Sequence, residues 1–294
     1  MRVVLLCAGY GTRFIAEAEQ SPNHRHLTRI PKPLLPIGGK PLIDHWLETL
    51  ATVPLVTKII IVANNVNFEA FRNNPGNVVC SKEVIVVNAN NVNFEAFRDN
   101  PGNVVCSKEV IVVNDGSNSN EQRSGAITCM KLGLQEQLDE ACLFIAGDTL
   151  FDGSFLLASF LKVFQEENGS DQDQPCSLIV DCPCPEERVH KHGIIETDAT
   201  GRVVSFLEKP DPSTTASRKQ SPCFYLIHQE HLHEIEEFLK ETKNGPLKAR
   251  DATGNFLKFL VERNLVKSLS VSKRFDVGGL DSYLECCEEF KKTA

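Results

Sequence analysis

The chain has 294 residues, of which 41% are hydrophobic and 24% are charged, and its formal net charge is −8. This composition is ordinary for one large globular domain and argues against disorder. The negative charge and the absence of a Lys/Arg-rich run argue against a nucleic-acid-binding protein. Neither nucleic acid nor a membrane is expected as a partner, and an anionic substrate would have to be held by a local cluster of cations.

The cysteines indicate a reducing compartment. Their number, eleven, is odd, and Cys286 and Cys287 are adjacent. No signal-type apolar segment follows Met1, so we expect reduced thiols and a cytoplasmic protein. The Cys-Pro-Cys at 182–184 has no second pair at zinc-ribbon spacing, so structural zinc is not expected.

The first predicted strand, residues 3–7, stops at two closely spaced glycines, Gly9 and Gly11. Such a loop lets backbone N–H groups approach a phosphate, and Arg13 and Lys32 then supply the counter-charge. No Gly-Lys-Ser/Thr closes a Walker loop, and the third glycine of a dinucleotide fingerprint is missing. The pattern predicts a nucleoside triphosphate site.

Apolar, β-rich runs alternate with helical patterns along the chain. The expected strands are 3–7, 58–63, 83–87, 143–146, 177–180, 202–207 and 223–227. The expected helices are 42–51, 126–138, 155–167, 231–240, 255–262 and 280–291. Such alternation implies βαβ crossovers, with ligands at the carboxyl ends of the strands. We expect an α/β fold, a Rossmann-like three-layer sandwich with a mostly parallel central sheet, formed by residues 1–294 as a single domain.

Residues 63–88 and 89–114 form a tandem duplicate of 26 residues that differs at one position. Each copy carries an expected short helix, at 68–72 or 94–98, and a strand that ends in Val-Ile-Val-Val-Asn. The fold needs one such unit, and a solenoid needs at least three repeats, so a repeat architecture is not expected. One copy must either add a strand at the sheet edge or loop out.

Two acidic residues follow predicted strands. Asp148 comes after the strand at 143–146, and Asp276 follows a strand-like run at 267–271. Carboxylates at strand ends suit Mg²⁺, which takes oxygen ligands and usually keeps waters and substrate phosphates in its remaining positions. Either aspartate by itself could also be a turn or N-cap residue.

The segment 192–210 reads as a β-hairpin with Asp198 and Gly201 in its turn, and its second strand ends in Glu208 and Lys209. A carboxylate beside an ammonium can bind two different parts of a sugar phosphate. Glu208 would accept hydrogen bonds from hydroxyls, and Lys209 would meet the phosphate. A surface ion pair is the alternative.

Together with Pro-Lys-Pro at 31–33, these motifs resemble the signature of the sugar-1-phosphate nucleotidylyltransferases, the family of glucose-1-phosphate thymidylyltransferase. The resemblance implies the nucleotide-diphospho-sugar transferase type of sandwich. It implies a Mg²⁺-dependent enzyme that joins a nucleoside triphosphate and a sugar 1-phosphate, giving an NDP-sugar and pyrophosphate. It also implies a homo-oligomer, as for many family members.

The resemblance assigns roles to individual residues. Arg13 and Lys32 are the expected catalytic cations, and Asp148 and Asp276 are the expected metal ligands. The residues expected to bind the nucleotide are Leu6, Ala8, Gly9, Gly11, Thr12, Gln122 and Gly125. The residues expected to bind the sugar phosphate are Gly193, Glu208 and Lys209.

Three segments depart from the family pattern. The base-recognition loop at 121–127 is shorter than in the thymidylyltransferases, and Ser124 in it is expected to cap the next helix. Ser-Pro-Cys-Phe-Tyr at 221–225 stands where the family commonly has Asn-x-Gly-Ile-Tyr, which leaves the acceptor open. The polar stretch 14–30 is longer than usual, and reads either as a lid over bound triphosphate or as a solvated loop.

Other functions stay open at this stage. One alternative is a catalytically inactive regulatory subunit with the same fold. Another is a cytidylyltransferase that acts on a non-sugar phosphorylated acceptor such as phosphocholine. A nicotinamide dehydrogenase is disfavoured, because Asn64 and Asn65 stand where an acidic residue would hold the ribose. The sequence names neither the nucleotide nor the sugar.

Overall fold

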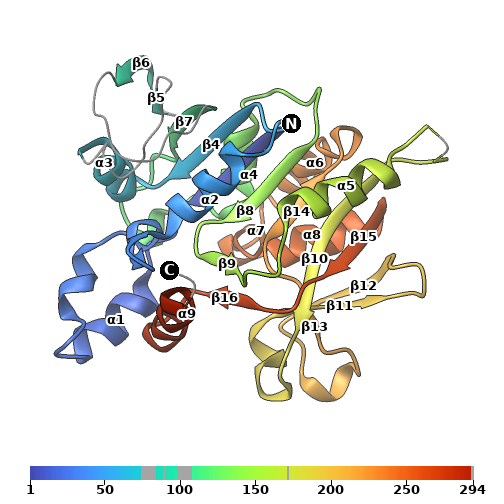
Figure 1. Cartoon of the computed structure of the whole chain (residues 1–294). Helices are drawn as coiled ribbons and strands as arrows, with labels where there is room; N and C mark the ends of the chain where they lie inside the picture. Colours follow the sequence, from blue (N-terminus) through green and yellow to red (C-terminus); the bar gives the residue numbers. More distant parts are fainter. Residues whose placement is uncertain (74–83, 89–90, 98–107, 171, 293–294) are drawn as a thin grey trace. The chain divides into compact units, whose positions relative to one another are not determined.

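The computed structural model describes residues 1–73, 84–88, 91–97, 108–170 and 172–292 (Figure 1). The chain divides into two compact units, each described by itself below. The first comprises Met1–Ser124, Ala146–Leu150 and Phe275–Ala294, and the second Gly125–Ile145 and Phe151–Arg274. That residues 1–294 form a single domain stays a prediction. Among the described residues, no helix is both long and apolar enough to cross a membrane.

The first unit contains a row of parallel strands. In spatial order they are β1 (Arg2–Cys7), β4 (Lys58–Ala63), β7 (Glu109–Asn114) and β5 (Val84–Asn88). The apolar side chains of β1 and β4 are buried on successive residues, as expected for parallel strands that are covered on both faces. Parallel neighbours need a crossover connection, and helices lie in the chain between β1 and β4 and between β4 and β5.

The remaining elements of this unit are helices and one small hairpin. They are α1 (Thr12–Gln20), η1 (Arg25–Arg29), η2 (Lys32–Leu34), β2 (Pro36–Ile37), β3 (Lys40–Pro41), α2 (Leu42–Ala51), α3 (Asn65–Asn73), η4 (Asn120–Gln122) and α9 (Leu280–Lys292). The polar stretch 14–30 is partly helical, because Phe14 and Ala18 bury one face of α1. The Phe14 ring packs edge-to-face on Tyr283 of α9, with 5.6 Å between centroids. The role of the stretch 14–30 as a lid stays a prediction.

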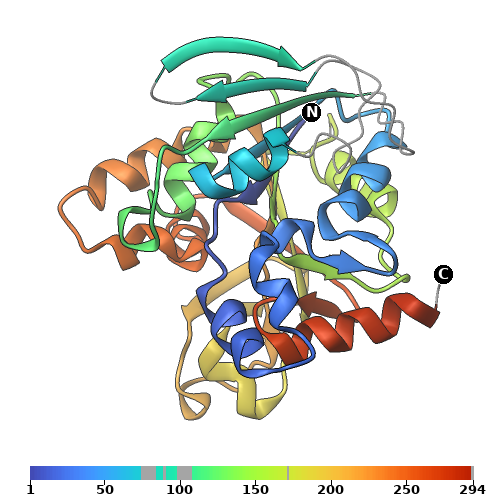
Figure 2. The same ribbon diagram turned by 90° about the vertical axis from the view of Figure 1, so that its left-hand side faces the viewer.

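The duplication adds strands at the end of the row. The strand of the second copy, β7, pairs with β4, and the strand of the first copy, β5, lies outside it. Beyond β5 lies β6 (Asn91–Phe97), which is antiparallel to it (Figure 2). Of the two alternatives, an added edge strand or a looped-out copy, the structure has strands added at the edge.

The helix expected at 94–98 is wrong for its described part, since residues up to Phe97 form β6. The identical residues of the first copy form α3. The physical reason is tertiary: Asn67 N donates to Asn64 Oδ1 (2.8 Å) at the start of α3, and the Phe68 side chain is buried. In the second copy the same residues instead pair with β5, and Arg98 lies outside the described residues.

The second unit has mainly antiparallel pairing. Its strands, in spatial order, are β8 (Cys142–Ala146), β14 (Phe224–Ile227), β10 (Cys176–Pro183), β13 (Lys219–Gln220), β11 (Gly193–Thr197) and β12 (Val203–Glu208). In addition, β15 (Leu265–Ser270) runs parallel to β10. The predicted hairpin is confirmed as β11 and β12, with Gly201 at φ +82° in its turn. With parallel pairs in the first unit and helices in both, the predicted α/β class is confirmed.

The helices of the second unit are α4 (Ala126–Leu134), α5 (Leu157–Glu167), η5 (Glu186–Lys191), η6 (Pro212–Thr214), η7 (Gln229–His231), α6 (Glu234–Glu241), α7 (Leu247–Asp251) and α8 (Thr253–Val261). Two short strands, β9 (Thr149–Phe151) and β16 (Arg274–Asp276), have residues in both units, and Ala146, the last residue of β8, belongs to the first. The expected Ser124 cap of α4 is wrong. Gly125 at φ +89° precedes α4 without a side-chain cap, and Ser124 Oγ donates to Asp115 O (3.4 Å).

Candidate active site

The glycine loop connects β1 to α1 in the first unit. Gly11 has φ +65°, which favours glycine, and its carbonyl accepts from Ile15 N (2.9 Å) at the first turn of α1. A Cβ atom built on Gly9 would meet no atom within 4 Å, so the loop is open there. Thr12, the first residue of α1, is exposed. A loop that leads into a helix N-terminus favours an anion.

Lys32 extends from η2 past this loop. A Cβ atom on Gly11 would lie 3.7 Å from Lys32 Cε, and Lys32 Nζ lies 2.9 Å from Asp148 Oδ2. The side chains of Lys32 and Asp148 are 15% and 30% exposed. The ammonium therefore lies between the glycine loop and the carboxylate.

The backbone around Asp148 is held against the end of β1. Gly147 N donates to Leu6 O (2.9 Å), and a Cβ atom on Gly147 would lie 2.7 Å from Cys7 Sγ. Only glycine fits at this position. Burial raises the pKa of the Cys7 thiol, and the nearby Asp148 carboxylate raises it further, so Cys7 stays a neutral thiol.

Asp276 lies next to Asp148, because Val277 N donates to Asp148 O (2.9 Å). Arg13 Nε donates to the carbonyl of Gly278 (2.9 Å). A Cβ atom on Gly278 would overlap the Arg13 guanidinium and would lie 3.0 Å from Asp276 Oδ1. Gly278 thus makes room for the guanidinium beside the Asp276 carboxylate, a role that the motif analysis did not predict.

The structure therefore brings Arg13, Lys32, Asp148 and Asp276 together at the end of β1. Within the part of the chain that is described, no group of three or more His, Cys, Asp or Glu side chains could hold a metal ion. A divalent cation at these two carboxylates would need further ligands, and waters with phosphate oxygens are the usual ones for Mg²⁺.

Two further residues contact the glycine loop and were missed by motif reasoning, namely Asn64 and Asn67. Asn64 Nδ2 donates to Ala8 O (2.9 Å), and Asn67 Nδ2 donates to Cys7 O (2.7 Å). The signal available in the sequence was an Asn-Asn pair directly after an apolar strand.

The predicted base-recognition residues lie in different units. Gln122 is exposed in η4 of the first unit, and Gly125 directly precedes α4 of the second. Gly125 has a positive φ, and a Cβ atom built there would lie 3.0 Å from Arg250 O. Backbone conformation and packing therefore account for a glycine at this position. In the first unit, the Ser117 hydroxyl donates to Asp115 Oδ1 (2.7 Å) and shapes the turn that precedes η4.

The predicted sugar-phosphate residues lie together in the second unit. Gly193 and Glu208 are opposite each other in the β11–β12 pair. Lys209 N donates to His192 O (3.1 Å), and Lys209 Nζ lies 3.6 Å from Glu208 Oε1. Lys209 has φ +51°, a left-handed conformation that costs a non-glycine residue roughly 1 kcal/mol. Strain of this kind often marks a functional site.

The Phe206 ring lies between two glycines, Gly193 and Gly254. A Cβ atom on Gly193 would overlap the ring, and one on Gly254 would lie 2.6 Å from it and would overlap Glu208 Oε2. The Glu208 carboxylate is therefore packed on the first turn of α8, where the helix dipole favours a negative charge. Gly193 has a packing reason to be glycine beside its predicted contact with the sugar.

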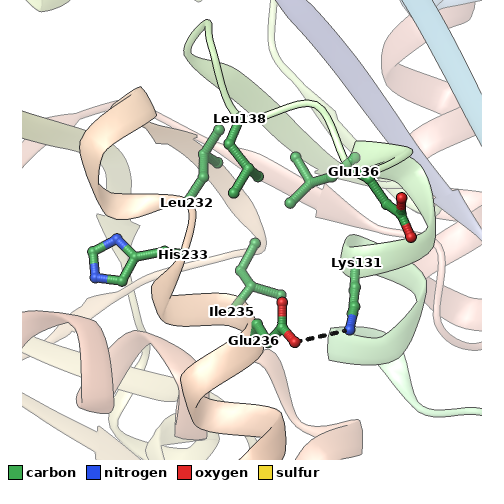
Figure 3. Close-up of a pocket in the computed structure, with 8 residues that line it drawn as sticks. Lys131, Glu136, Leu138, Leu232, His233, Ile235 and Glu236 are labelled. Atoms are coloured by element: carbon green, nitrogen blue, oxygen red, sulfur yellow. Dashed lines mark ion pairs between the residues drawn. The ribbon is translucent and has the colours of Figure 1, made fainter.

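A separate cavity of about 270 Å³ lies between α4 and α6 (Figure 3). Its lining residues are Lys131, Leu134, Glu136, Leu138, Leu232, His233, Ile235 and Glu236. Lys131 Nζ lies 3.5 Å from Glu236 Oε1 at its rim. This cavity contains none of the predicted site residues.

Comparison with known proteins gives a family and a fold. The sequence model of the family described as nucleotidyl transferase matches residues 2–293. A bifunctional protein GlmU of Methanococcus vannielii is 25% identical over 278 residues, which are 92% of this chain and 50% of that protein. A 2-C-methyl-D-erythritol 4-phosphate cytidylyltransferase of Chlamydia pneumoniae is 33% identical over 73 residues, 25% of this chain and 29% of that protein. The chain thus spans half or less of the length of these relatives.

Solved structures share the fold at low identity. A UDP-glucose pyrophosphorylase complexed with UDP-glucose has a TM-score of 0.67 and 18% identity, with 100% of this chain and 99% of that chain covered. A putative glucose-1-phosphate thymidylyltransferase from Bacillus anthracis has a TM-score of 0.65 and 15% identity, with coverage of 99% and 95%. These likenesses confirm the predicted α/β nucleotidyltransferase fold.

Proposed function

Because the chain belongs to the nucleotidyl transferase family, we propose that it is a sugar-1-phosphate nucleotidylyltransferase, which forms an NDP-sugar and releases pyrophosphate. The observation that carries this proposal is the convergence of Arg13, Lys32, Asp148 and Asp276 beside the glycine loop, from distant stretches of the chain. Two cations and two carboxylates at one anion-binding loop suit a triphosphate that binds with a metal ion.

On the nucleotide side, the loop from Ala8 to Gly11 and the N-terminus of α1 would hold phosphate oxygens. Arg13 and Lys32 would neutralise the charge that develops on the leaving pyrophosphate. Their anchoring, by Gly278 O and by Asp148, keeps both cations near the loop before the substrate arrives. The other expected nucleotide contacts are Leu6, Thr12, Gln122 and Gly125.

We expect Mg²⁺ as the cofactor, held by Asp148 and Asp276. The bond from Val277 N to Asp148 O brings the two residues close, and carboxylates are ligands that Mg²⁺ prefers. When bound, Mg²⁺ would neutralise phosphate charge and orient the α-phosphate.

On the acceptor side, Lys209 would hold the phosphate of the sugar 1-phosphate, and Glu208 would accept hydrogen bonds from its hydroxyls. A phosphate oxygen of the acceptor attacks the α-phosphorus in line, and pyrophosphate leaves. The protein takes little part in the covalent chemistry, so positioning of the substrates and neutralisation of their charge would account for most of the rate acceleration. The left-handed backbone at Lys209 supports a functional role for this residue.

A second candidate is a cytidylyltransferase that acts on a non-sugar phosphorylated acceptor. The observation in its favour is the 33% identity over 73 residues with the Chlamydia pneumoniae cytidylyltransferase. A catalytically inactive subunit with the same fold is a third reading. The presence of Arg13, Lys32, Asp148 and Asp276 in one cluster argues against it.

The test is an assay of pyrophosphate release with Mg²⁺, across the four nucleoside triphosphates and a panel of acceptors. The panel comprises glucose 1-phosphate, other sugar 1-phosphates, phosphocholine and 2-C-methyl-D-erythritol 4-phosphate. Turnover with a sugar 1-phosphate supports the proposal, and turnover only with CTP and a non-sugar acceptor supports the second candidate. A chain that binds triphosphate and turns over no pair would be the inactive subunit.

We also propose that the protein works in the cytoplasm. Among the described cysteines, Cys7, Cys176, Cys182, Cys184 and Cys287 are free thiols. Free thiols in this number fit a reducing compartment. A homo-oligomer stays a prediction.

A further inference from the structure

We propose that Asn64 and Asn67 orient the glycine loop so that its N–H groups face the triphosphate, and that both are positioning residues of this site. This inference rests on the proposed function. Both asparagines lie at the start of α3, in the first copy of the duplication.

The contacts fix the orientation of both side-chain amides. Asn64 Oδ1 accepts from Asn67 N (2.8 Å), so the Asn64 amide nitrogen must face the other way, toward Ala8 O at 2.9 Å. Asn67 Nδ2 donates to Cys7 O (2.7 Å) and reaches Gly9 O (3.3 Å). Asn64 is fully buried and Asn67 is 5% exposed, so these bonds are shielded from water.

The carbonyls of Cys7, Ala8 and Gly9 therefore point toward the two asparagines. In a trans peptide, each carbonyl points opposite to the N–H of the next residue. The N–H groups of Ala8, Gly9 and Tyr10 are thus turned away from α3. Successive N–H groups that face one way form a concave anion site, and the open space beside Gly9 lets a ligand approach.

An amide side chain suits this position, because its oxygen accepts from the helix N-terminus while its nitrogen donates to a loop carbonyl. The second copy repeats these residues, but Asn93 lies in β6, which pairs with β5. The counterpart of Asn64 in the second copy, Asn90, lies outside the described residues.

The substitution Asn64→Asp separates the two functions of the side chain. It keeps the oxygen that accepts from Asn67 N, and replaces the donor to Ala8 O with a second acceptor. The matched control is Asn65→Asp, whose Nδ2 donates to Asn118 Oδ1 (3.0 Å) and not to the loop. Both variants add one negative charge at the start of α3, so the control accounts for the charge itself. Asn64 is fully buried and Asn65 only half-buried, so the melting temperature of each variant is needed to separate the cost of burying the charge.

Binding of inorganic tripolyphosphate with Mg²⁺, measured by isothermal titration calorimetry, is the readout. We expect Asn64→Asp to raise the Kd at least tenfold and the control to change it less than twofold. In turnover assays, the KM for the nucleoside triphosphate should rise with little change in the KM for the acceptor. A merely structural effect would lower the melting temperature and affect both substrates.

If Asn64→Asp folds poorly, Asn64→Ser takes its place, because serine caps a helix but is too short to reach Ala8 O. Asn67→Asp tests the second contact in the same way. Parent-like tripolyphosphate binding by all the folded variants would overturn this inference alone. A parent chain that neither binds tripolyphosphate nor releases pyrophosphate would overturn the proposed function with it.

Discussion

Lys32 Nζ lies 2.9 Å from Asp148 Oδ2, although 116 positions separate the two residues in the chain. The pair joins a proposed phosphate-binding cation to a proposed metal ligand. The two charges compensate each other, which limits the cost of their partial burial. A metal-bound triphosphate would offer each side chain a new partner, the phosphate for Lys32 and the metal for Asp148.

Asp148→Asn and Asp276→Asn are each expected to reduce turnover about a hundredfold while the protein stays folded. Loss of one preorganised electrostatic contact typically costs ~3 kcal/mol of transition-state stabilisation. The measurement is pyrophosphate release in saturating Mg²⁺, with Mn²⁺ binding followed in parallel by electron paramagnetic resonance. Asp281→Asn on the exposed face of α9 is the control. Parent-like turnover in both site variants would show that the metal assignment is wrong.

We expect Lys32→Ala and Lys209→Ala to weaken the binding of different substrates. Lys32 lies beside the glycine loop, so its removal should weaken triphosphate binding and turnover. Lys209 lies at the end of the β11–β12 hairpin, so its removal should chiefly raise the KM for the phosphorylated acceptor. Calorimetry with each substrate separates the two, and Lys258→Ala on α8 controls for net charge. If Lys209→Ala abolished triphosphate binding and spared the acceptor, the two assignments would have to be exchanged.

Gly254→Ala should raise the KM for the acceptor by about tenfold or more, since small misplacements of binding groups cost that much. The added methyl group would overlap Glu208 Oε2 and displace the carboxylate. Gly153→Ala is the matched control, because a Cβ atom there meets nothing within 4 Å. In a Glu208→Ala background the Gly254 substitution should have a smaller effect on acceptor binding, because only its overlap with the Phe206 ring remains. An equal effect in both backgrounds would show that Gly254 does not act through Glu208.

Deletion of residues 89–114 should preserve folding and activity, with a melting temperature at least equal to that of the parent. The deletion joins Asn88 to Asp115, and the remaining strand has the same Val-Ile-Val-Val-Asn sequence as β7. It can therefore take the place of β7 beside β4, without the added edge strands that invite pairing with other chains. A thermal melt and a turnover assay check this. Loss of folding would mean that both copies are integral to the sheet.

His231 should make the stability of the protein depend on pH. It is buried, its Nδ1 lies 2.8 Å from Ser177 Oγ, and burial with the nearby His228 lowers its pKa to about 4. The unfolded chain, with an ordinary pKa near 6.5, binds the proton that the folded state resists. Stability should therefore fall by roughly 2–3 kcal/mol as the pH drops from about 6.5 to about 4.

Urea denaturation between pH 4 and 8 measures this effect, as the difference between the parent and His231→Asn. The difference is needed because Asp44 acts with the opposite sign. Burial and the nearby Glu48 carboxylate raise the pKa of Asp44 to about 7, so its contribution falls as pH rises from about 4 to 7. His26→Asn, at an exposed position, is the control. Equal pH slopes for the parent and His231→Asn would contradict the prediction.

Local pattern was enough to predict most of the elements and to single out the four charged residues that meet at the candidate site. The helix at 42–51 and the strand at 58–63 match α2 and β4, because their apolar periodicity is carried by neighbouring residues. The motifs at Arg13 and Asp148 were visible because each combines a strand end with a charged residue at short spacing. These features depend on residues a few positions apart, so the sequence by itself determined them.

Only the tertiary structure decided what depends on distant partners. One seven-residue sequence occurs twice, at 65–71 and at 91–97. The first occurrence forms helix in α3, where Asn64 and the buried Phe68 anchor it, and the second forms strand in β6, where an open strand edge is available. The room that Gly278 leaves for Arg13 likewise depends on a contact across 265 positions. Intrinsic propensities differ by less than the free energy of such contacts, so the surroundings, and not the local sequence, select the conformation.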